Sequence, residues 1–204
     1  MIQKAFLAKS PKGEEKRQEI ERVARSILIS DGYAGVSLRM IASKLEISVG
    51  NLQYYFPTKD DLVEAIITRE TQNLTNMLND FAWGPGDVQA STRQAVEVLI
   101  NYYAGEAGRM YAITESLAVH DPRYNKLKKD GYAYVLGHIE QLIGYALPDM
   151  ATNKRAGLAQ VLVALIDGAS LQAQSAGYGA GSEGLEFLTT NVSKAIEHLL
   201  ESWE

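Results

Sequence analysis

Residues 47–62, ISVGNLQYYFPTKDDL, carry side chains whose types and spacing suit contact with double-stranded DNA. In a helix over residues 49–55, Val49, Gly50 and Asn51 would lie at the amino-terminal end. A helix can enter the major groove only where its outward residues are small, or short and polar. Gly50 would permit close approach, Val49 would contact a thymine methyl group and Asn51 would pair with adenine. The alternative is that this glycine and the neighbouring tyrosines only border the protein core.

Four further residues have side chains that can contact the DNA around these three. Tyr54, Tyr55 and Lys59 carry hydroxyl and ammonium groups, which bind the sugar-phosphate backbone and fix the register of a complex without reading the sequence. Arg39 can reach a guanine or a phosphate. We therefore predict that all four belong to a DNA-binding surface.

Three helical patterns must position these side chains. Apolar residues recur at helical spacing over residues 14–31, 38–45 and 49–55, and Gly32 is expected to end the first of these helices. Ser37 and Ser48 can cap the second and third helices, and both are included in the predicted DNA-binding set. The connection over residues 46–48 is short enough for a helix-turn-helix. The inward residues are expected to be Ile20, Val23, Ala24, Ile27, Leu28, Leu38, Ile41, Ala42, Leu45, Leu52 and either Tyr55 or Phe56.

Charge is distributed unevenly along the chain. The 204 residues carry a net charge of −5, which taken alone argues against a nucleic-acid partner. Residues 1–60, however, hold ten basic and seven acidic residues, a balance of +3, whereas the remaining 144 hold ten basic and eighteen acidic residues, a balance of −8. This asymmetry favours a basic N-terminal part that can bind phosphates, followed by an acidic C-terminal part. The alternative is that the charges are distributed over the surface without a function.

Residues 31–62, DGYAGVSLRMIASKLEISVGNLQYYFPTKDDL, resemble the DNA-binding head of the tetracycline-repressor-like family of bacterial transcription regulators. The order and spacing of the small, polar and apolar positions agree over this stretch. Gln53 departs from the family pattern, which most often has a phosphate-contacting Tyr there, so the contact is expected to pass to the Gln53 amide or to Tyr54. The resemblance implies an all-α protein with an N-terminal helix-turn-helix DNA-binding domain, residues 1–60, and a larger C-terminal helical domain for ligand binding and dimerisation, residues 61–204.

Several other functions lack the residues that they need. The chain has no Cys and three widely separated His, so we expect no disulfide, no metal site and no cofactor. A literal Gly-x-Gly-x-x-Gly at residues 179–184 follows a helical pattern instead of a strand, which indicates a loop between helices and not a dinucleotide site. No nucleophile–base pairing is found, so the chain is not expected to be an enzyme. No apolar run long enough for a membrane span and no export signal is recognised, and a cytoplasmic location is expected.

The remaining sequence shows helical periodicity in almost every segment. Thr58 and Asp61 are spaced as a capping box at the start of a long helix that would run to about residue 81. WGPGD, residues 83–87, is the candidate linker between domains. Further helices are predicted over residues 88–104, 107–119, 122–146, 153–176 and 184–203, with Asp121 as an N-cap.

Tyrosines are concentrated between residues 102 and 145, where seven of the eleven lie. An apolar cavity between helices with a few polar groups is how such a protein would hold a small molecule. Tyr111 and Glu115 share one helix face, suited to a ligand with a cationic or hydrogen-bond-donating end, whereas Arg109 lies well round the helix. The alternative is that Glu115 pairs with a surface Lys or Arg. The predicted ligand-binding residues are Tyr103, Met110, Tyr111, Glu115 and Tyr132.

The last two predicted helices have broad apolar faces, which would form either the core or a four-helix dimer interface. Small residues at positions 157, 168, 169 and 173 would let a partner helix come close. The resemblance implies dimerisation of this kind. The predicted interface residues are Leu158, Leu162, Leu165, Ala169, Val192, Ile196 and Leu199.

The function predicted from these features is a homodimeric repressor that binds a palindromic operator and is released by a small-molecule inducer. The alternative is a DNA-binding regulator without an inducer, controlled by a protein partner or by its own level.

Overall fold

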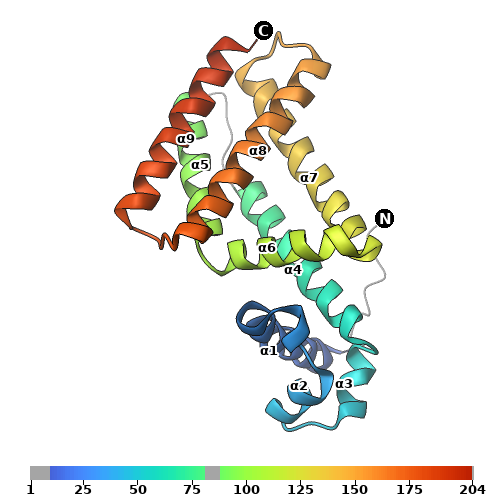
Figure 1. Cartoon of the computed structure of the whole chain (residues 1–204). Helices are drawn as coiled ribbons and strands as arrows, with labels where there is room; N and C mark the ends of the chain where they lie inside the picture. Colours follow the sequence, from blue (N-terminus) through green and yellow to red (C-terminus); the bar gives the residue numbers. More distant parts are fainter. Residues whose placement is uncertain (1–9, 81–87, 204) are drawn as a thin grey trace. The chain divides into compact units, whose positions relative to one another are not determined.

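The computed structural model describes residues 10–80 and 88–203, and within them it consists of helices joined by short turns, without strands (Figure 1). The predicted all-α fold is confirmed. The helices are α1 (Pro11–Gly35), α2 (Leu38–Lys44), α3 (Val49–Tyr55), α4 (Lys59–Asp80), α5 (Val88–Ala104), α6 (Glu106–His120), α7 (Pro122–Ala146), α8 (Thr152–Ala176) and α9 (Glu183–Ser202).

The chain divides into two compact units, Met1–Glu70 and Thr71–Glu204. The division lies inside α4, later than the predicted boundary at residue 60. Its position follows from the first turns of α4, where Leu62, Val63, Ile66 and Ile67 are buried. Glu70 also binds Arg25 of α1, with 2.7 Å between the carboxylate oxygen and the guanidinium Nε. The predicted linker at residues 83–87 lies outside the described residues.

The first helix is longer than predicted because a cap precedes it. Ser10 accepts a hydrogen bond from the backbone N–H of Gly13 at 3.2 Å, and Pro11 occupies the first helical turn, where its missing N–H is harmless. The predicted start at residue 14 is therefore wrong by one turn. Gly32, the predicted end, interrupts the helical conformation with a φ of 68° and a ψ of −175°, a backbone shape that residues with a Cβ rarely adopt.

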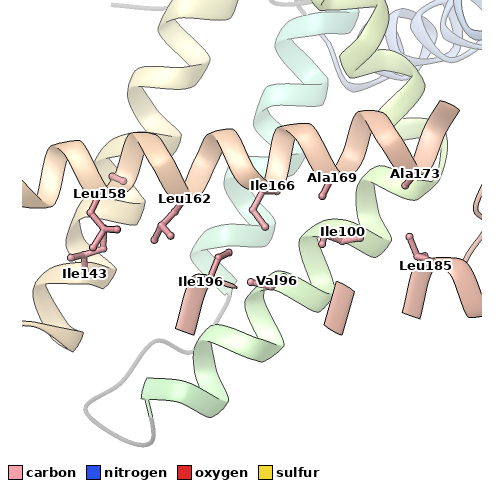
Figure 2. Packing of buried hydrophobic residues seen from close by; sticks show 11 residues of the cluster. Val96, Ile100, Ile143, Leu158, Leu162, Ile166, Ala169, Ala173, Leu185 and Ile196 are labelled. Atoms are coloured by element: carbon pink, nitrogen blue, oxygen red, sulfur yellow. The ribbon is translucent and has the colours of Figure 1, made fainter. Parts of the chain in front are cut away.

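The core of Thr71–Glu204 is built from four long helices. α5 packs against α8 and α9, and α7 packs against α8. Figure 2 shows Leu162 and Ile166 of α8 close to Val96 of α5 and Ile196 of α9, with Leu158 beside Ile143 of α7. These side chains follow the helical spacing of the sequence, so periodicity correctly predicted the apolar faces.

Caps fix most of the remaining boundaries. Thr58 and Asp61 form the predicted capping box, in which each side chain accepts a hydrogen bond from the other residue's backbone N–H at 3.0–3.1 Å. Asp121 caps α7 by accepting from Arg123 N–H at 2.8 Å. The glycine-rich segment is a loop between α8 and α9, with a left-handed φ at Gly177 and at Gly181. Thus the literal glycine motif forms no strand-to-helix turn.

α8 corrects the expectation that no segment is apolar enough to cross a membrane. It contains an 18-residue window with a mean hydropathy of 1.4, and by length and composition alone it could span a bilayer. The buried residues along it, among them Leu158, Leu162 and Ala173, pack in the core of Thr71–Glu204. A core helix of a globular domain passes the same test.

Candidate nucleic-acid interface and ligand cavity

α3 presents small and polar side chains on its outer face. Gly50, Asn51, Gln53 and Tyr54 are exposed, and Tyr54 has 71% of its side-chain surface accessible. A Cβ added to Gly50 would meet nothing within 4 Å, so the backbone there is open to a close approach. Val49 and Tyr55 are half-buried at the edge of this face.

Buried residues on both helices of the pair hold α3 in place. Leu52 and Phe56 are buried, as are Ile41 and Ala42 of α2, which packs against α3. Phe56, not Tyr55, is the second inward residue. Between the helices, Ile47 N–H donates to Ala42 C=O at 3.0 Å. Glu46 adopts the left-handed conformation that this tight turn requires, with a φ of 53°. The expected helix-turn-helix is therefore present.

The two serines at the helix starts differ. The Ser48 hydroxyl accepts a hydrogen bond from Asn51 N–H at 3.1 Å, as predicted for a cap. Ser37 occupies the N-cap position of α2, but its side chain makes no capping hydrogen bond, so that part of the prediction is wrong. Ser37 and Arg39 are both exposed. Their contact with DNA, like that of the α3 residues, stays a prediction.

Lys59 lies at the start of α4 against an aromatic ring. Its ammonium group is 3.9 Å from the centre of the Tyr33 ring, and the Tyr33 hydroxyl donates a hydrogen bond to Asp60. Partial burial lowers the pKa of Lys59, and the nearby Asp60 carboxylate acts in the opposite direction. The ring therefore fixes where this cation is presented.

Ion pairs between α1 and α4 were not foreseen from the sequence. Glu21 is buried, with 3% of its surface accessible, and pairs with Arg17 at 3.2 Å and with Arg69. Glu21 interrupts the apolar stripe of the first helix between Ile20 and Ala24, and this acid at a core-facing position was the available signal.

A mainly apolar cavity of about 120 Å³ lies within Thr71–Glu204. It is lined by side chains from α4, α5, α7, α8 and α9. They are Leu74, Leu78, Thr92, Ala95, Val96, Leu99, Tyr103, Val135, Ile139, Leu142, Ile143, Tyr145, Leu162, Val163, Ile166, Asp167, Ile196 and Leu200. Such a space can hold a small apolar molecule.

Of the five predicted ligand-binding residues, Tyr103 lines this cavity. Met110 is buried on α6, and Tyr111 contacts Tyr103 with 5.5 Å between ring centres. Glu115 is not among the lining residues of this cavity, and it pairs with Lys128 of α7, in agreement with the alternative of a Lys or Arg partner. Arg109 is exposed, in keeping with its predicted direction.

Tyr132 connects the predicted residues to one that the sequence analysis missed. Its hydroxyl donates to the Asp167 carboxylate, and the Tyr111 and Tyr132 hydroxyl oxygens are 2.7 Å apart. Burial raises the pKa of both tyrosines, and the hydrogen bond to Asp167 adds to the rise for Tyr132. Burial is also the main reason why the pKa of Asp167 is raised above its usual 3.8. The available signal was a single acid within the apolar run 157–173.

The predicted dimer residues fall into two groups. Leu158, Leu162, Ala169 and Ile196 are buried in the core of a single chain, which leaves little of their surface for contact with a partner and argues against this part of the prediction. Leu165, Val192 and Leu199 are half-buried and pack against the same core. Periodicity located the apolar faces correctly, but a face that packs inside the chain has the same period as one that packs against another chain.

Within residues 10–80 and 88–203, no group of three or more His, Asp or Glu is placed to hold a metal ion.

Sequence and structural comparisons connect these features with known regulators. Residues 20–66 match the bacterial regulatory proteins of the tetR family. A nicotine-responsive transcriptional repressor from Paenarthrobacter nicotinovorans is 25% identical over 161 residues, which is 78% of this chain and 83% of that protein.

Two solved structures share the fold over most of their length. A TetR transcription regulator from Haloarcula marismortui is 19% identical, with a TM-score of 0.76 over 91% of this chain and 98% of that one. A transcriptional regulator from Saccharomonospora viridis in complex with choline is 22% identical, with a TM-score of 0.72 over 91% and 97% of the two chains. At these identities the structural likeness shows the fold alone.

The matched segment, residues 20–66, contains the helix-turn-helix and the first turns of α4. The match shows a tetR-type DNA-binding domain over residues 20–66, and over most of its length the helical fold is similar to that of tetR-family transcriptional regulators.

Proposed function

We propose that this regulator is a homodimeric repressor that binds a palindromic operator and releases it when a small molecule enters the cavity within Thr71–Glu204. The observation that carries the proposal is this cavity of about 120 Å³, because its mainly apolar lining with a few polar groups is typical of a small-molecule site. The DNA-binding residues are those of the α2 and α3 surface together with Lys59.

The α3 face supports sequence-specific binding. Asn51 and Gly50 are exposed at the start of a helix whose inner side is buried, the arrangement that a recognition helix needs in the major groove. Arg39, Tyr54 and Lys59 supply donors for phosphate or base contacts. A protein that acts on DNA in this way would work in the cytoplasm.

The outer face of α8 supports dimerisation. Val161, Ala164, Leu171 and Ser175 are exposed and follow one another at helical spacing with Gly157 and Gly168. A Cβ added to either glycine would meet nothing within 4 Å, so this face is small and open. We therefore place the contact between subunits on the outer face of α8, which replaces the buried residues first predicted. In such a dimer, two DNA-binding domains whose recognition helices lie about 34 Å apart, or a multiple of that distance, would bind two half-sites of the operator.

Relatives support release by a small molecule. The similar repressor from Paenarthrobacter nicotinovorans is nicotine-responsive, and the Saccharomonospora viridis regulator was solved with choline. By analogy, a ligand in this chain's cavity would shift the separation of the heads, since effector and DNA can be coupled only through two states that bind them differently.

The test begins with the operator. Double-stranded DNA selected from a random library by the full chain should contain two inverted half-sites, and light scattering of the complex should give two chains on each operator. A selected site without inverted symmetry would contradict the homodimeric part of the proposal.

A library of small molecules should then be screened by thermal unfolding and by release of the labelled operator. A ligand at 100 times its dissociation constant should add about 2.7 kcal/mol of stability. If the protein binds its operator specifically but no small molecule stabilises it or releases it from the operator, the alternative function applies. The protein would then be a DNA-binding regulator without an inducer.

A further inference from the structure

Asp167 is the feature that sets the cavity apart from an ordinary apolar void. Among the described lining residues it is the only one with a charged side chain, and most of the others are Leu, Ile, Val or Ala. The cavity wall therefore combines an apolar body with one acidic point.

The neighbours of Asp167 are hydroxyl donors and not cations. Tyr132 donates to one carboxylate oxygen, and since that proton is used, Tyr111 is the donor to Tyr132. Lys128, the cation whose charge acts on the pKa of Asp167, is in ion-pair contact with Glu115. No ion pair involving Asp167 is found in the described part of the chain.

In the described part of the chain, the carboxylate of Asp167 has no cation in ion-pair contact with it. Its two oxygens offer about four lone-pair sites, more than the single hydrogen bond from the Tyr132 hydroxyl uses. Removing a carboxylate from water without a positive partner is costly, and the raised pKa of Asp167 reflects that cost. A cation arriving from outside would supply the charge that the protein does not.

Two aromatic side chains in the cavity lining would also favour a cation. Tyr103 and Tyr145 both line the cavity, and the face of a tyrosine ring attracts an ammonium group. The volume sets the size of the ligand, since an engineered cavity of about 150 Å³ binds benzene and this one measures about 120 Å³.

We infer that the ligand is a small organic cation, with an apolar body about the size of a single ring in the cavity and an ammonium group paired with Asp167. This inference rests on the proposed function, because it names the chemical class of molecule that the same cavity would accept.

Three probes of nearly equal shape test the charge. Benzylamine is cationic, benzyl alcohol is neutral and benzoate is anionic at pH 7.5. Their binding to the full chain should be measured by isothermal titration calorimetry, together with the variants Asp167→Asn and Asp130→Asn. Asp130 pairs with Lys126 elsewhere on α7 and does not line the cavity, so it is a matched control.

The unmodified chain and Asp130→Asn should bind benzylamine at least tenfold more tightly than benzyl alcohol, with benzoate weakest. Asp167→Asn should bring benzylamine to within about threefold of benzyl alcohol while leaving benzyl alcohol unchanged. Equal binding of the three probes, a preference for benzylamine that survives in Asp167→Asn, or no binding of any probe would overturn the inference.

Operator release is measured separately so that the two proposals can fail independently. If benzylamine binds through Asp167 but leaves the operator complex intact, the ligand class stands and release by this class of ligand fails. If another molecule releases the operator while the three probes bind equally, the repressor function stands and the inferred class fails.

Discussion

At the residue scale, the backbone of Asn51 takes part in the helix cap, whereas its side chain is free of that cap. Its N–H is bonded to the Ser48 hydroxyl at 3.1 Å, whereas its amide side chain is exposed on α3. An amide side chain can form two hydrogen bonds with adenine in the major groove. The side chain can therefore be removed without disturbing the cap that starts the helix.

Asn51→Ala should weaken binding to the selected operator by about 1–3 kcal/mol and relax base preference at one position in each half-site. Binding to random DNA should stay the same, because phosphate contacts supply it. A gel-shift titration on both DNAs measures this, with the exposed α4 residue changed by Asn73→Ala as control. Equal losses on both DNAs would show that Asn51 does not read a base.

Lys59 is predicted to contact a phosphate group of the DNA and not a base. Because its ammonium group is held against the Tyr33 ring, it would meet a phosphate at a fixed place. Lys59→Ala should weaken operator and random DNA alike and lower the slope of log affinity against log salt by roughly one unit per half-site. Lys59→Arg keeps the charge and should keep the slope. An unchanged slope in the alanine variant would remove Lys59 from the phosphate contacts.

Asp167 should reduce the stability of the ligand-free protein. Its pKa is raised in the folded chain by burial and by Glu115, against the opposing effects of Tyr132, Tyr111 and Lys128. An acid with a raised folded pKa binds its proton more tightly when folded, so stability is lost as pH rises from about 4 through that pKa. Asp167→Asn should remove this loss and raise the unfolding temperature at pH 7.5, with little difference near pH 3.5. A lower unfolding temperature at pH 7.5 would contradict it.

Whether a residue could be predicted depended on how far its partners lie along the chain. The Ser48 cap and the Thr58–Asp61 box involve residues three positions apart, and the sequence was sufficient for both. Glu115 is paired with Lys128 on the next helix, and which helices line a cavity is decided by tertiary packing. The role of Asp167 therefore could not be derived from spacing alone.

At the element scale, α8 has two apolar faces with different neighbours. One carries Leu158, Leu162 and Ala169 into the core of the chain, and the other exposes Val161, Ala164 and Leu171. The sequence showed an apolar helix with small residues but not which face would be covered by its own chain. The burial of the first face is what moves the expected subunit contact to the second.

Ala164→Arg should give a folded, helical monomer with at least tenfold weaker operator binding, because a charge placed at a closely packed symmetric interface is costly and occurs twice. Light scattering and circular dichroism measure assembly and helicity. Ala133→Arg adds the same side chain at an exposed position of α7 and should remain dimeric.

The buried Ala169 provides the contrast. Ala169→Arg should unfold the chain and not merely separate it, since only 5% of this residue is accessible. An intact dimer for Ala164→Arg would place the interface on another surface.

At the scale of the whole molecule, α4 is the element with residues in both units. Its first turns contribute Leu62 and Ile66 to the core of the first unit, and Leu74 and Leu78 line the cavity of the second. A continuous helix transmits a displacement along its axis better than a flexible linker would. We expect the coupling between ligand and operator to depend on the helical stretch between these two sets of residues.

Asn73→Gly tests that expectation, because Asn73 is exposed in α4 just beyond the division between the units. Glycine in a helix interior costs about 1 kcal/mol relative to alanine and loosens the backbone locally. The factor by which a confirmed inducer weakens operator binding, commonly 5–150-fold, should fall severalfold in Asn73→Gly and stay unchanged in Asn73→Ala.

Ligand binding without DNA and operator binding without ligand should both persist within about threefold in these variants. Reciprocity requires the operator to weaken inducer binding by the same reduced factor, which calorimetry on the operator complex measures. An unchanged factor in the glycine variant would assign the coupling to contacts other than the middle of α4.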